Sequence, residues 1–156
     1  MTFPRTDGDE FFLALGDLPL HPLAVHFAVA LFPVALVWLI IVAISSNLRR
    51  KQLGLSVLLV ALTVPFVFIA QQSGEALGET LYEPEPHSEF GEMMMPIAMA
   101  VLIIAALFWL SVKNRWNQLV AKAFGFLTVT VAIGAIAMTV VVGHSGAAAT
   151  WTSVLP

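Results

Sequence analysis

The placement of charged residues along the chain constrains its fold more than any other feature. Six of the seven basic residues lie in two short segments, 49–51 and 113–122. All ten acidic residues lie elsewhere, in segments 7–17 and 75–92. Basic loops of membrane proteins stay on the cytoplasmic side. We therefore predict that the two basic segments face the cytoplasm, and that the acidic segments and both termini lie outside.

Composition indicates that lipid is the solvent for this chain. Of its 156 residues 59% are apolar and 11% charged, with a mean hydropathy of +0.91, whereas a soluble domain is roughly half apolar and a quarter charged. The sequence has no extended cluster of lysine and arginine of the kind that binds nucleic acid. The chain has no cysteine, which excludes disulfides, thiolate metal sites, iron–sulfur clusters and covalent haem attachment by this chain.

Four uncharged apolar stretches lie between the charged segments, and about 20 such residues cross a bilayer. Short connections make successive helices antiparallel neighbours. We predict an all-α transmembrane four-helix bundle that forms a single domain over residues 1–156. The first twenty residues are acidic and amphipathic rather than basic and apolar, so we expect this N-terminal segment to be retained. The expected spans are about 22–44, 53–72, 93–112 and 123–143.

Prolines set the expected helix ends. His21 precedes Pro22, which favours an extended backbone, so His21 is expected just outside the first helix. Pro84 and Pro86 oppose a regular helix between the second and third spans. We expect only a short interfacial helix there, around residues 75–82. Each half of the chain carries an outer histidine, but this alone does not establish an internal duplication.

Titratable side chains gather at the outer ends of the predicted spans. Every histidine in the sequence falls at this level, and two glutamates flank the second and third spans there. An imidazole at such a depth needs a partner or a metal, because an unpaired polar group in an apolar site costs several kcal/mol. The candidate site residues are His21, His26, His87, His144, Glu75 and Glu92.

One chemical use of this set is bis-histidine ligation of haem b. His26 and His144 lie on the first and last spans, and Gly134 leaves room for a flat macrocycle on the face of His144. His21 and His87 would then bind the haem propionates, tune the potential or bind a second cofactor. This hypothesis makes the chain a membrane-embedded electron-transfer component, with an outer-face redox protein or quinol as its partner.

Two alternatives stay open. The histidines, with Glu75 and Glu92, suit a bare copper, zinc or iron ion. In the second alternative, the chain is a cofactor-free accessory subunit of a larger membrane complex. Its histidines would then bind backbone groups or water. No phosphate-binding loop or nucleophile elbow is present, so a stand-alone enzyme is disfavoured. No charge lies mid-span, which argues against a pump or transporter made by this chain alone.

Short motifs resemble a family of small bacterial four-span membrane proteins catalogued as a domain of unknown function. The chain has an HPxxVHF signature within residues 20–27, an SGxxA-like element at 73–77, and a histidine with a Gly-Glu pair at 87–92. It ends in a GHxGG-like turn at 143–147, where Ala147 replaces the second glycine and Thr150-Trp151 replaces a tyrosine-containing tail.

This resemblance covers nearly the whole chain and carries its own expectations. The family is similar to small cytochrome b-like bundles, and its relatives can be fused to Rieske or cytochrome c modules. The resemblance therefore implies electron transport at the outer face of a bacterial inner (plasma) membrane. It is an analogy at the level of fold and does not identify the cofactor.

Overall fold

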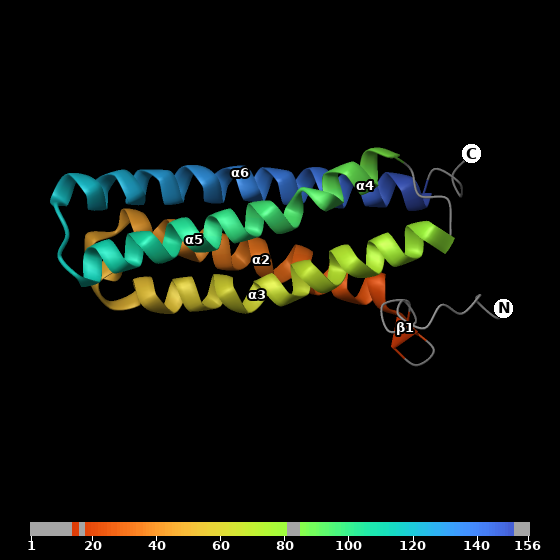
Figure 1. Cartoon of the computed structure of the whole chain (residues 1–156), viewed down its shortest axis with the longest axis horizontal. Helices are drawn as coiled ribbons and strands as arrows, with labels where there is room; N and C mark the ends of the chain where they lie inside the picture. Colours follow the sequence, from red (N-terminus) through yellow and green to blue (C-terminus); the bar gives the residue numbers. More distant parts are fainter. Residues whose placement is uncertain (1–13, 16–17, 81–84, 152–156) are drawn as a thin grey trace.

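The computed structural model describes residues 14–15, 18–80 and 85–151, and these form a helical bundle (Figure 1). A short antiparallel pair, β1 (Ala14–Leu15) and β2 (Leu18–Pro19), precedes the bundle. Four helical segments are long and apolar enough to cross a membrane, which confirms the predicted all-α, four-span fold. The helices are α2 (Leu20–Ile44), α3 (Ser46–Thr80), α4 (Glu85–Glu92), α5 (Met94–Lys113) and α6 (Gln118–Trp151).

The four long helices run antiparallel in a closed ring. α2 packs on α3 and α5 packs on α6, while contacts of α3 with α5 and of α2 with α6 join the two pairs. The short α4 lies mainly against α6 (Figure 1). The start of α2, the end of α3, all of α4 and the end of α6 therefore meet at one end, here called the histidine end. The short connections at residues 45 and 114–117 lie at the other, here called the basic end.

Tight side-chain packing fills the middle of the bundle. Phe32, Leu36 and Leu39 of α2 belong to one core cluster with Val101 and Phe108 of α5, and all five are fully buried. The outward faces of the helices are as apolar as the inward faces. Burial of an apolar face away from a polar one therefore does not hold the helices together. In lipid, such helices associate through close van der Waals packing and hydrogen bonds.

Buried hydroxyl groups are satisfied within their own helices. Ser56, Ser111, Thr128 and Thr139 each donate to a backbone carbonyl three or four residues earlier, at 2.7–2.9 Å. These hydroxyl groups are therefore paired without water. A hydrocarbon environment requires this, because it offers no water to hydrogen-bond. The bundle thus tolerates polar residues without forming polar contacts between helices at these positions.

Cations pack against aromatic rings at the basic end. The Arg49 guanidinium donates to the Ala43 carbonyl at 2.6 Å and lies 5.6 Å from the ring centroid of Phe108. The Lys113 ammonium lies 4.6 Å from the ring centroid of Trp109. Such cation–π contacts hold the charged groups beside the apolar core.

Three helix ends differ from the expected ones. His21 lies in the first turn of α2, because the first-turn position of Pro22 would have no intrahelical N–H bond to lose. The segment 75–82 is largely the end of α3, and α4 accommodates Pro86 in its own first turn. α6 continues as a helix through the GHxGG-like segment to Trp151.

Two of the long helices, α3 and α6, clearly exceed the thickness of a bilayer. At about 1.5 Å per residue, α3 with 35 residues and α6 with 34 are each roughly 50 Å long, against about 30 Å of hydrocarbon. Relative to the expected spans, α3 extends seven residues farther at the basic end and eight at the histidine end, and α6 extends five and eight. Both ends of the bundle therefore reach past the expected spans.

Candidate functional site

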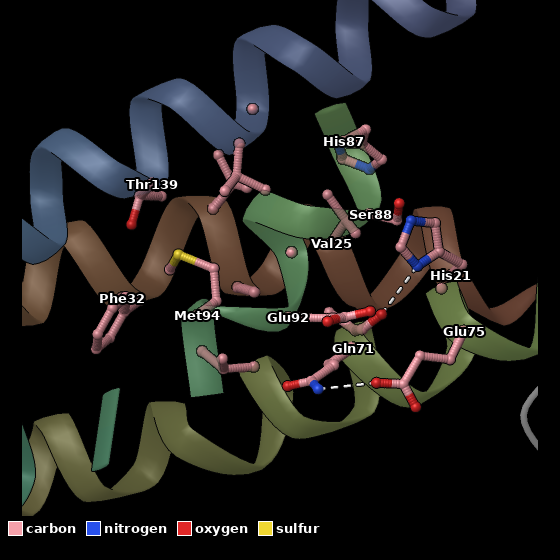
Figure 2. A pocket seen from close by; sticks show the side chains of 18 of the residues that line it. His21, Val25, Phe32, Gln71, Glu75, His87, Ser88, Glu92, Met94 and Thr139 are labelled. Atoms are coloured by element: carbon pink, nitrogen blue, oxygen red, sulfur yellow. Dashed lines mark hydrogen bonds between the residues drawn. The ribbon is translucent and has the colours of Figure 1, made fainter. Parts of the chain in front are cut away.

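A cavity of about 540 Å³ lies inside the histidine end of the bundle (Figure 2). Residues from all five helices line it. Phe32, Val67 and Met94 form part of its apolar wall, which extends toward the middle of the membrane. Apart from Thr139, the polar lining residues gather nearer the end of the bundle: His21, Gln71, Glu75, His87, Ser88 and Glu92.

His21 enters the cavity from the first turn of α2, and α3 fixes its ring. Its Nδ1 lies 2.9 Å from the Ala70 carbonyl and 3.3 Å from the Ser73 hydroxyl. A carbonyl oxygen only accepts, so Nδ1 carries the proton in this contact. In the neutral imidazole the lone pair is then on Nε2.

His87 is held in the same way by α6. Its Nδ1 lies 3.0 Å from Ser145 Oγ. When the Ser145 hydroxyl donates its own proton to the Val142 carbonyl, at 3.0 Å, its oxygen accepts from His87 Nδ1. In that arrangement the neutral His87 imidazole also has its lone pair on Nε2.

The two imidazoles lie close together at the same end of the cavity. Their ring centroids are 6.4 Å apart and the ring planes are inclined at 74°, and Figure 2 shows both rings beside Ser88. The sequence indicated a secondary role for His21 and His87 beside His26 and His144, whereas the structure places both His21 and His87 in the lining of the cavity. One signal was available in the sequence: each is followed, 52 and 58 residues later, by a serine that is the first residue of a Ser-Gly pair.

The structure places His26 and His144 outside this cavity. Both side chains are exposed, and His26 Nδ1 donates to the Pro22 carbonyl within its own helix. His26 lies five residues after His21, about 140° farther around α2. His144 lies one residue before Ser145, about 100° from it around α6. The histidines expected to face each other across the bundle therefore do not line its cavity.

Acceptor atoms dominate the polar part of the cavity. The exposed Glu75 carboxylate accepts from the side-chain amides of Gln71 and Gln72 at 2.8 and 2.7 Å. Gln71 Oε1 is buried and has no hydrogen-bond partner among the described residues. The Glu92 carboxylate adds another acceptor, and the described lining contains no lysine or arginine. The lining therefore favours a metal or a hydrogen-bond donor, and a ligand that also carries carboxylates, such as haem with its propionates, would have to direct them out of the cavity.

The described residues do not assemble a site for a bare metal ion. No group of three or more histidines, aspartates or glutamates in this part of the chain is arranged to hold one. Catalytic zinc takes about three protein ligands and structural zinc about four. The six predicted ligands are thus divided, with His21 and His87 adjacent, Glu75 and Glu92 also lining the cavity, and His26 and His144 outside it.

Residues 17–155 match a family model described as a predicted membrane protein (DUF2231). No curated protein and no solved structure matches the chain.

Proposed function

Because the chain belongs to the DUF2231 family of predicted membrane proteins, we propose a function carried out within the bilayer: electron transfer through a haem b bound by His21 and His87. The observation that carries this proposal is the pair of imidazoles, each fixed through Nδ1, at a centroid separation of 6.4 Å. This proposal replaces the His26–His144 pair as the axial ligands.

The spacing of the pair suits one metal ion between two rings. A metal–imidazole bond of about 2 Å, added to a ring radius of roughly 1 Å on each side, separates two opposed ring centroids by roughly 6 Å. A porphyrin supplies four nitrogen ligands, so haem needs only two from the protein. That requirement fits the histidine pair better than a bare ion, for which the described residues offer no third ligand nearby.

The surroundings of the pair also suit a metal cofactor. Histidines that bind metals usually donate their other ring N–H to an oxygen atom, which fixes tautomer and orientation. Ala70 and Ser145 provide those oxygens. The cavity volume falls within the roughly 300–1,000 Å³ typical of ligand sites. When bound, haem would supply one-electron transfer, and the apolar wall would limit access of water to it.

An optical spectrum of the purified protein, expressed with ample haem and recorded before and after dithionite, tests this proposal. We expect a Soret band with reduced α and β bands. His21→Ala and His87→Ala should each abolish or strongly reduce this absorption. His26→Ala and His144→Ala are matched controls that should retain it, because both side chains are exposed outside the cavity. The reverse pattern would restore the His26–His144 assignment, and a featureless spectrum would exclude haem.

A hydroquinone is a second candidate for the same cavity, favoured by the unpartnered Gln71 Oε1 and the acceptor-rich lining. Its two hydroxyl groups donate hydrogen bonds, and its apolar tail suits the deeper wall. If the protein shows no haem absorption, titration with a short-tailed hydroquinone in nanodiscs should show saturable binding. Gln71→Leu should weaken that binding, while Gln72→Leu, which does not line the cavity, should not.

Elemental analysis separates the remaining possibilities. Stoichiometric copper, zinc or iron without porphyrin would favour a bare metal site, with Glu75 and Glu92 recruited on binding. A cofactor-free chain that copurifies with other membrane subunits would favour an accessory role. Under the lead proposal the protein lies in the bacterial inner membrane and exchanges electrons with an outer-face redox protein or quinol.

A further inference from the structure

We infer that Ser73–Gly74 and Ser145–Gly146 are two copies of one device that positions the imidazoles of His21 and His87. In both copies the serine hydroxyl contacts the carbonyl three residues earlier in its helix. Ser73 Oγ lies 3.1 Å from the Ala70 oxygen, and Ser145 Oγ lies 3.0 Å from the Val142 oxygen. Ser73 Oγ also makes a shorter contact, 2.6 Å, with the Ile69 oxygen four residues earlier. Each histidine Nδ1 contacts this serine–carbonyl unit.

The glycine that follows each serine makes room for the ring. A Cβ atom on Gly74 would lie 2.9 Å from His21 Cε1, and one on Gly146 would lie 2.8 Å from His87 Cε1. Real Cβ atoms essentially never approach another atom so closely. Each imidazole thus occupies the space that a side chain on the facing helix would otherwise take.

Serine and glycine together restrict the ring in two ways. The Nδ1 contact selects the tautomer and the rotation about the side chain, while the glycine surface fixes how closely the ring approaches the helix. Because the two copies lie on different helices, α3 and α6, they hold the two rings at 74° to each other. These residues are positioning residues, since they act through the histidines.

This inference is tested on the cofactor-free full-length protein by NMR of ¹⁵N-labelled histidine in nanodiscs. Single His→Gln substitutions assign the four histidines. We expect His21 and His87 as Nδ1–H tautomers. Ser145→Ala should abolish that preference at His87 and leave the His21 signals unchanged, and Ser145→Thr should restore it. Gly146→Ala should shift the His87 ring signals, and Gly74→Ala should shift those of His21.

Gly143→Ala is the matched control on α6, because nothing lies within 4 Å of the added Cβ. Its His87 signals should equal those of the wild type. The inference is wrong if Ser145→Ala and Gly146→Ala leave the His87 signals unchanged, or if Gly143→Ala moves them equally.

A second measurement rests on the proposed function as well. With haem bound, crossed axial imidazole planes should give a strongly anisotropic low-spin EPR signal in the oxidised protein, rather than a rhombic one. Gly146→Ala should change its largest g value while haem content stays near the wild-type level. Loss of haem binding overall would contradict the proposed function alone, since the NMR result decides the positioning role independently.

Discussion

At the scale of single residues, glycines determine where the large side chains of this bundle lie. Gly54 faces the Trp109 indole and Gly125 faces the Phe108 ring, just as Gly74 and Gly146 face the two imidazoles. In lipid, helices associate through close packing rather than by removal of apolar surface from water. A glycine opposite an aromatic ring therefore contributes to the stability of the bundle itself.

Gly54→Ala should destabilise the protein by on the order of 1 kcal/mol, because the added Cβ would lie 2.9 Å from Trp109 Nε1 and overpack the basic end. Gly134→Ala is the control, since its Cβ would meet nothing within 4 Å and alanine favours the helix. Thermal unfolding in detergent should show a lower midpoint for Gly54→Ala only. Equal midpoints for the two variants would show that Trp109 can move away from the added Cβ without a loss of stability.

Residue-level detail is also where the sequence was least informative. Charge distribution and the length of apolar stretches depend on local composition, so they predicted the spans. Which histidine faces the interior depends on rotation of the helix and on the position of α4. The expectation that His21 lies outside the first helix directed attention to His26, although His21 is the residue that enters the cavity.

At the scale of elements, the two ends of the bundle carry different side chains. The histidine end holds the cavity with His21 and His87. The basic end holds Arg49 and Lys113 against aromatic rings, beside the short connections near Ser45 and at 114–117. The predicted orientation, with the basic end in the cytoplasm, therefore places the cavity toward the outside.

Cysteine labelling in whole cells tests this orientation, because the sequence contains no cysteine. Glu89→Cys, exposed on α4, should react with an impermeant maleimide added to intact cells. Ser46→Cys, exposed at the start of α3, should react only after the membrane is permeabilised. Labelling of Ser46→Cys in intact cells would overturn the assignment of sides.

At the scale of the whole molecule, the bundle consists of two halves that each contribute half of the site. The α2–α3 half carries His21 with Ser73–Gly74, and the α4–α6 half carries His87 with Ser145–Gly146. The sequence showed one outer histidine in each half, but neither was connected with a Ser-Gly pair, so this equivalence was missed. The correspondence involves residues more than fifty positions apart, which only the packing of the helices brings together.

Dividing the chain between α3 and α4 should test the dependence of the site on both halves. We expect neither fragment alone to bind haem stoichiometrically, because each has one of the two cavity histidines. Co-expression of the fragments should restore the absorption spectrum, since packing of α3 on α5 and of α2 on α6 joins the halves. Full haem content in either fragment alone would contradict the shared site.

The position of the histidine pair at one end of the bundle also bears on energy conversion. All four histidines of the sequence lie toward that end, and the spans carry no charged residue between the two ends. An electron that enters and leaves at this face crosses little of the transmembrane field, which acts at about 2.3 kcal/mol per charge per 100 mV. Under the proposed function, collapse of the membrane potential by an ionophore should leave the redox equilibrium with an outer-face partner unchanged. Such a protein would relay electrons along the membrane surface without charging the membrane.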